Sequence, residues 1–200
     1  IVMNNNSTLL KSEEIGQDFL DRFLLPYKVD CRYLKAAQFY PDVSNFNTNQ
    51  SGRVGSGYLC GDFSIPDSCY IQDTGHFNAV EFNICYNQSM YVMLGYLIQN
   101  KLLNLHDWDL DIYQRCQLSD CLIVNLSSTF KKPINAKNFQ GQVSIDKCSK
   151  RGNLILLKTQ CAFYDQKEGR SEGNVTLAIL NGSSASSAEA GHDARALVNG

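Results

Sequence analysis

The side chains best suited to proton transfer and oxyanion chemistry lie in one polar turn, Thr74-Gly75-His76-Phe77-Asn78. An apolar run to Leu103 follows it. The first turn of a helix leaves N–H groups unpaired and carries partial positive charge, so it would stabilise a carbonyl oxygen that gains negative charge. Gly75 would let the backbone approach closely, and His76 can exchange a proton near neutral pH. Alternatively, Thr74 or Asn78 only caps a helix and His76 is a surface residue.

The stretch from Thr74 to Leu103 that must position these groups is predicted to form a long central helix. It is apolar on nearly every face, which is typical of a buried helix. A membrane span is the alternative, but polar residues interrupt the run well before the eighteen or so apolar residues that a span needs. They are Glu81, Asn83, Asn87, Gln88 and Ser89. We therefore expect no membrane span.

Composition favours one domain with a substantial core, since the chain has 200 residues and is 44% hydrophobic. The net charge of −2 is too small to indicate nucleic acid or an anionic membrane as a partner. The start has no basic segment followed by an apolar run, so no signal peptide is expected and the predicted location is the cytoplasm.

The eight cysteines form no CxxC pair and no Cys/His ligand set. No metal site is therefore expected. Several lie in apolar stretches, where free cysteine packs as a small hydrophobic residue. We expect all eight to be reduced thiols without a disulfide.

The remaining elements are predicted from periodicity and from turn residues. Helices are expected at 12–25, capped by Ser12, and at 107–118. Strands are expected at 29–40, 58–65, 121–130, 139–148, 153–164 and 174–180, with a loop at 41–57 and turns at 131–133 and 166–173. Residues 1–8 and the tail 181–200 are predicted to be disordered, and the tail could be an artificial extension.

This order favours an α+β fold in which an antiparallel sheet wraps around one long helix, the hotdog arrangement. A single hotdog domain is expected over residues 9–180. Several strings in the chain also resemble the FcoT family, and the most specific of them is Thr74-Gly75-His76-Phe77-Asn78-Ala79-Val80-Glu81. The others are Leu25-Pro26-Tyr27, Cys31-Arg32-Tyr33-Leu34, Tyr70-Ile71, Cys85 with Asn87-Gln88 and Tyr91, Gln117-Leu118-Ser119, and Phe130 with Lys132-Pro133-Ile134-Asn135.

The resemblance implies a hotdog enzyme that acts on fatty acyl thioesters. It implies addition of glycine to the β-carbon of a (2E)-enoyl chain on an acyl carrier protein. The product would be a free 3-[(carboxymethyl)amino] fatty acid of isonitrile lipopeptide biosynthesis. Plain long-chain acyl-CoA thioesterase activity is the alternative, and a non-catalytic acyl-binding protein is a third hypothesis. No cofactor is expected beyond the phosphopantetheine arm of the carrier protein or CoA, and the expected assembly is a homodimer or a hexamer.

By motif, the family's activity-related residues fall on Tyr27, Tyr70 and Asn78. We add His76 as the base that deprotonates glycine, and Glu81 as a group that orients His76 or acts as base itself. A second set is predicted to contact substrate, and Arg32 in it either binds the glycine carboxylate or is an ordinary solvent-facing charge. That set is Gly75, Phe77, Asn87, Tyr33 and Arg32.

Overall fold

The computed structural model describes residues 12–41, 57–72 and 74–181. The predictions for residues 1–8, for most of the loop between Pro41 and Gly57, and for the tail beyond residue 181 lie outside these ranges.

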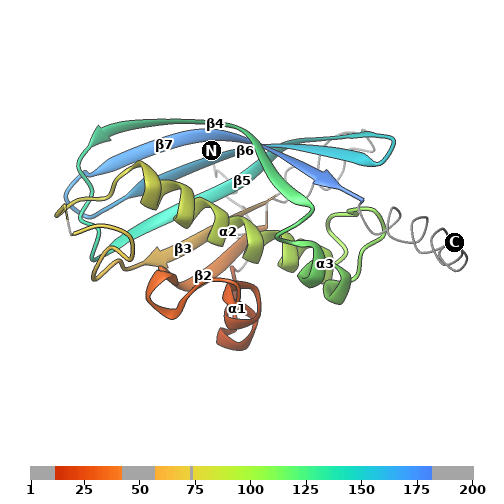
Figure 1. The fold of residues 1–200 in the computed structure, drawn as a ribbon, viewed down its shortest axis with the longest axis horizontal. Coiled ribbons are helices and arrows are strands. Elements are labelled where there is room, and N and C mark those ends of the chain that lie inside the picture. The colour runs from red at the N-terminus through yellow and green to blue at the C-terminus, as the bar shows by residue number, and fades with distance from the viewer. Residues whose placement is uncertain (1–11, 42–56, 73, 182–200) are drawn as a thin grey trace, which may run out of the picture.

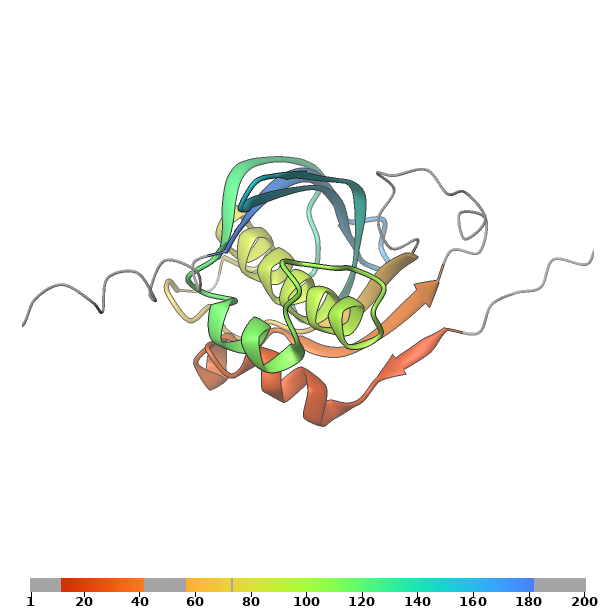
Figure 2. The same cartoon turned by 90° about the vertical axis from the view of Figure 1, so that its right-hand side faces the viewer.

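Within the described residues, seven strands form one antiparallel sheet in the order β1-β2-β3-β5-β6-β7-β4. The sheet curls around the helix α2 (Figures 1 and 2). This confirms the predicted α+β hotdog arrangement. The strands are β1 Glu13–Ile15, β2 Leu34–Pro41, β3 Gly57–Phe63, β4 Cys121–Lys132, β5 Phe139–Arg151, β6 Leu154–Tyr164 and β7 Arg170–Leu180.

The central helix α2 spans Ala79–Gln99, which is shorter at both ends than predicted. Gly75 has a φ of +77°, a left-handed conformation that breaks the helix, and Asn78 caps the first turn. Most of the helix is buried against the sheet and against α1. None of the described helices combines the length and the apolar character that crossing a membrane requires.

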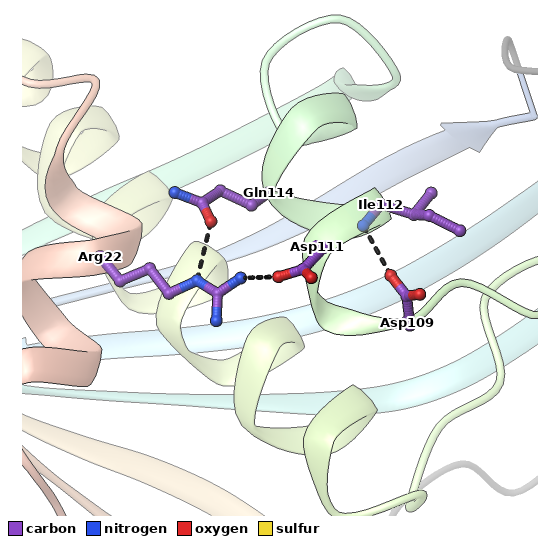
Figure 3. A network of polar contacts seen from close by, with 5 residues as sticks. All are labelled: Arg22, Asp109, Asp111, Ile112 and Gln114. Atoms are coloured by element: carbon purple, nitrogen blue, oxygen red, sulfur yellow. Dashed lines mark hydrogen bonds and ion pairs between the residues drawn. The ribbon is translucent and has the colours of Figure 1, made fainter.

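Two short helices cover the open side of α2 (Figure 2), α1 at Gln17–Leu24 and α3 at Leu110–Cys116. Arg22 of α1 joins them by donating to Gln114 Oε1 at 2.8 Å and by an ion pair with Asp111 (Figure 3). Asp109 caps α3 by accepting from the Ile112 amide at 2.7 Å (Figure 3).

Four predicted boundaries are wrong, three of them because residues predicted as helix or turn pair as strand. Glu13–Ile15, predicted as helix, pairs instead with Ala37–Phe39 of β2. Lys131 and Lys132, predicted as a turn, end β4, where Lys131 meets Glu172 of β7 at 2.5 Å. Residues 170–173 are strand for the same reason. The predicted strand at 29–40 begins only at Leu34, after the 3₁₀ turn η1 at Val29–Cys31.

The prediction of eight free thiols is wrong for Cys31 and Cys69, which form a disulfide with a Cα–Cα separation of 6.0 Å. They are 38 residues apart in sequence, and the fold brings η1 beside the segment that precedes α2. Local patterns carry no signal for such a pairing. The other six cysteines are free, and within the described ranges no three His, Cys, Asp or Glu side chains gather as a metal site would need.

Candidate active site

The site is built on Asn78, which caps α2. Its Oδ1 accepts hydrogen bonds from the amides of Val80 at 2.9 Å and Glu81 at 3.2 Å, and from the Tyr70 hydroxyl at 2.8 Å. Three donors converge on one atom, so that atom must be the amide oxygen and the Nδ2 group must point the other way. The cap thus fixes the orientation of the carboxamide.

Glu81 completes the cap from the inside of the fold. Its Oε2 accepts from the Asn78 amide at 3.2 Å, and its Oε1 accepts from the Ser68 hydroxyl at 2.6 Å. The side chain is 1% exposed, and these bonds together with the positive end of the helix offset the burial of its charge. Both carboxylate oxygens are therefore occupied, and Glu81 holds the cap and the Ser68 segment in place.

Tyr70 closes the other side of Asn78. Its ring is 43% exposed, so the pair lies at the surface. Burial of part of the ring and the nearby Glu81 carboxylate raise the pKa of Tyr70, while the bond to Asn78 lowers it; the net shift is upward. The hydroxyl therefore stays protonated and donates its hydrogen to Asn78 Oδ1, so that Tyr70 helps to hold the Asn78 carboxamide in place.

Two donors at this helix end have no hydrogen-bond partner within the described part of the chain. They are the Nδ2 group of Asn78 and the backbone N–H of Ala79. The next three amides of the helix are occupied: those of Val80 and Glu81 donate to Asn78 Oδ1, and that of Phe82 donates to the Asn78 carbonyl. Ala79 is exposed. Donors beside a helix N-terminus are suited to an oxygen atom that gains negative charge.

His76 lies in the exposed turn before this cap. Its Nδ1 is 3.0 Å from the Thr74 carbonyl oxygen, which can only accept, so Nδ1 carries a hydrogen; in the neutral ring the lone pair is then on Nε2. Thr74 Oγ1 in turn donates to the His76 carbonyl at 3.1 Å. Among the described residues, the hydrogen bonds of Glu81 go to Asn78 and Ser68 and that of the His76 ring goes to Thr74, so the structure does not bring out the predicted orientation of His76 by Glu81.

Tyr33 and Gln88 tie a second segment to the site. Gln88, fully buried on α2, accepts from the amides of Tyr33 and Leu34 at 2.9 Å each and donates to the Cys31 carbonyl at 2.5 Å. The buried Tyr33 hydroxyl donates to Cys69 Sγ at 3.2 Å and accepts from the Cys69 amide at 3.4 Å. Tyr33 therefore supports the site from below its surface.

Tyr27 and Arg32 lie apart from the Asn78 cap. The Tyr27 ring packs near Tyr91, with ring centroids 6.3 Å apart, more than three turns along α2. Burial raises the pKa of Tyr27, and Tyr91 and Cys85 add to the shift. Arg32 donates from Nε to the Tyr27 carbonyl at 3.1 Å and from a second nitrogen to the Leu25 carbonyl at 3.4 Å. The guanidinium thus braces the Tyr27 loop.

The other predicted contact residues divide between the core and the surface. Phe77 is buried, packs against Phe139 with ring centroids 4.8 Å apart, and donates its amide to Ile134, so it anchors the turn to the sheet. Asn87 is half-buried, with its Nδ2 at 3.5 Å from Asn83 Oδ1. Gly75 is exposed, and a Cβ there would meet no atom within 4 Å, so the positive φ is what the turn requires.

Sequence reasoning missed Ser68 and Gln88 as members of this arrangement. Ser68 is one small polar residue in a turn, and nothing nearby in sequence marks it as the partner of a buried carboxylate. Gln88 had a signal, since a polar amide inside an otherwise apolar helix must find partners when it is buried.

The fold and the cap geometry can now be set beside known proteins. The family model described as FcoT-like thioesterase domain matches residues 22–179. The chain belongs to the FcoT-like thioesterase family, as the resemblance predicted.

Proteins named (2E)-enoyl-[ACP] glycyltransferase are among its relatives. The one from Streptomyces coeruleorubidus is 36% identical over 168 residues, which cover 81% of this chain and 95% of the relative. The one from Mycobacterium marinum is 34% identical over 172 residues, covering 84% and 88%. Among solved structures, yhdA of Lactococcus lactis, named as a thioesterase, gives a TM-score of 0.46 at 10% identity over 77% of this chain and 98% of that chain.

Proposed function

We propose that this protein is an enzyme that adds glycine to the β-carbon of a (2E)-enoyl thioester carried by an acyl carrier protein. The proposal rests on the fixed pair of donors at the start of α2, Asn78 Nδ2 and the Ala79 N–H. Sequence similarity to the proteins named (2E)-enoyl-[ACP] glycyltransferase supports the proposal.

The donor pair fits the charge that this reaction creates. When the glycine amine forms a C–N bond to the β-carbon, the π electrons of the enoyl chain move to the thioester oxygen as an enolate. Asn78 and Ala79 would hold that oxygen, and Tyr70 and Glu81 keep Asn78 oriented before the substrate arrives. The α-carbon then takes up a proton, and the C–C double bond is lost.

Glycine must give up a proton, because its ammonium form has no lone pair. The free Nε2 of His76 is the base in the proposal, since the bond from Nδ1 to Thr74 fixes the tautomer. Glu81 is not proposed as the base because both of its oxygens are occupied. Release of the fatty acid then needs water to attack the thioester carbon, the C–S bond to break, and the thiol of the phosphopantetheine arm to leave with a proton.

Direct hydrolysis of a fatty acyl-CoA is the second candidate function. The same donor pair would hold the oxyanion of the tetrahedral intermediate, so the cap geometry favours both reactions equally. The residue that separates them is His76, because only glycine addition needs a base for an amine. The site requires no metal in either scheme, and cytoplasmic location remains part of the proposal.

We further propose that the protein is a homodimer joined through β4. This strand is the long edge of the sheet, and large apolar side chains on it are exposed: Leu122, Val124, Leu126 and Phe130. The opposite edge, β1, has three residues, two of which are glutamates. A long apolar edge is a pairing surface, and a second copy in antiparallel register would cover it. Assembly into a hexamer is a prediction that this edge does not address.

The test of function compares two substrates. The protein is incubated with a (2E)-enoyl carrier protein with and without glycine, and separately with a saturated acyl-CoA. A mass increase equal to one glycine, seen only with the enoyl substrate, supports glycine addition. Hydrolysis of both substrates without an adduct would assign the protein to the thioesterase alternative.

A further inference from the structure

The Cys31–Cys69 disulfide joins the two chain segments that carry the tyrosines of the candidate site. Cys31 ends η1 and precedes Arg32, whose Nε donates to the Tyr27 carbonyl. Cys69 stands between Ser68, which bonds Glu81, and Tyr70, which bonds Asn78. Both neighbours of Cys69 therefore make contacts to the helix cap.

Hydrogen bonds from buried residues hold both halves of the disulfide, and the exposed half is Cys69. The Cys31 carbonyl accepts from Gln88 of α2, and that amide group is fully buried. On the other side, Cys69 contacts Tyr33 through its sulfur and its amide, at 3.2 and 3.4 Å. The S–S bond is thus the covalent link between a rigid point on α2 and the more exposed segment that holds Tyr70 in place.

The disulfide lies near the surface of the protein. Cys69 is exposed and Cys31 is half-buried, whereas the free thiols of Cys85, Cys121 and Cys161 are buried. Disulfides in reducing compartments are usually transient, catalytic or redox-sensing. An accessible disulfide within two residues of an active-site contact fits the last of these roles.

We propose that the Cys31–Cys69 disulfide is a reversible redox clamp that positions Tyr70 against Asn78, so that its reduction lowers the activity of the site. A dithiol reductant supplies the two electrons and two protons: its thiolate attacks one sulfur to give a mixed disulfide. Its second thiol then releases the protein as two free thiols, and the reductant leaves as a disulfide. The effect on activity rests on the proposed function, whereas the effect on the Tyr70 segment does not.

Two measurements on the same samples test the clamp. Hydrogen exchange by mass spectrometry follows the amides of residues 68–78, and kinetics with the enoyl carrier protein and glycine give kcat and KM. Wild type is measured oxidised, after treatment with dithiothreitol, and after reoxidation. Cys69→Ser removes the clamp, and Cys60→Ser is the control because Cys60 is a half-buried free thiol on β3.

Reduction is expected to speed hydrogen exchange across residues 68–78. It is also expected to lower kcat by about ten- to a hundredfold with a smaller change in KM, because misplacing a group of the site by about 1 Å can lower the rate by about a hundredfold. Reoxidation restores both values. Cys60→Ser responds to the reductant as wild type does, and Cys69→Ser behaves as reduced protein in both conditions.

Equal exchange and equal kcat in the oxidised and reduced proteins would overturn the proposal, as would a loss that reoxidation does not restore. If exchange changes as expected but neither form adds glycine, the clamp stands and the proposed function fails. If Cys69→Ser does not fold, the three states of wild type carry the same comparison.

Discussion

Replacing Asn78 by aspartate separates its two roles, because the two side chains have the same shape. An aspartate oxygen can still accept from Val80, Glu81 and Tyr70, so the cap and the orientation are kept. The group that is lost is the Nδ2 donor. Removal of one oxyanion donor typically lowers kcat by about 10²–10³. We expect this loss for both glycine addition and thioester hydrolysis.

The stability of the variant follows from the same contacts. A carboxylate at the N-terminus of a helix gains about 0.3–1 kcal/mol from the dipole, which offsets repulsion from Glu81. The free energy of unfolding of Asn78→Asp should therefore stay within about 1 kcal/mol of wild type. Asn78→Ala loses the cap as well, at about 0.5–2 kcal/mol. A loss near 1 kcal/mol lowers Tm by roughly 2–4 °C in a domain of this size.

Urea unfolding and steady-state kinetics on the two variants make the comparison. Asn78→Asp should be a stable, nearly inactive protein, and Asn78→Ala a less stable one with a similar loss of activity. Near-wild-type activity in Asn78→Asp would refute the reasoning, because the Nδ2 group would then have no part in the chemistry. Activity that falls only in Asn78→Ala would leave Asn78 as a cap alone.

Four further substitutions test the rest of the arrangement. His76→Ala should cut glycine addition by about 10²–10⁴ and acyl-CoA hydrolysis much less; equal losses would remove the base assignment. Ser68→Ala should lower the free energy of unfolding by about 1.5–3 kcal/mol, since it removes a bond to a buried carboxylate; an unchanged urea midpoint contradicts this. Gln88→Leu leaves three backbone groups unpaired, so it should cost several kcal/mol at about 1–3 kcal/mol each, and a midpoint near wild type would argue against the bracing role. Val124→Lys, on an edge residue that is 57% exposed, should give a monomer by light scattering, whereas Val29→Lys should not; a dimer in both would exclude the β4 interface.

The fold was predictable because its signals are local and strong. The apolar run after Asn78 marks a buried helix, and successive strand patterns after Cys121 mark the sheet. The errors fall where tertiary pairing overrides local residue preference. Glu13–Ile15 becomes an edge strand because β2 offers it a partner. β4 continues to Lys132 because Lys132 pairs with Arg170 of β7, past an irregularity at Lys131.

The site was predictable only in part. The motif located Asn78, Glu81 and His76 together because they are close in sequence. The hydrogen bond from the Tyr70 hydroxyl to Asn78 Oδ1 joins residues on either side of a loop. The spacing of the two residues in the sequence does not show that this bond forms. The disulfide depends on two segments 38 residues apart, and the prediction of reduced thiols failed there for that reason.

The central claim is that the donors at the start of α2 serve the addition of glycine to an enoyl thioester. The most direct test supplies ¹⁵N-labelled glycine and a (2E)-enoyl carrier protein to wild type and to Asn78→Asp, and analyses the released acids by mass spectrometry. We predict a labelled β-amino fatty acid from wild type and about 10²–10³ less of it from the variant. An unlabelled free enoic acid as the sole product of wild type, or equal labelled product from both proteins, would contradict the claim.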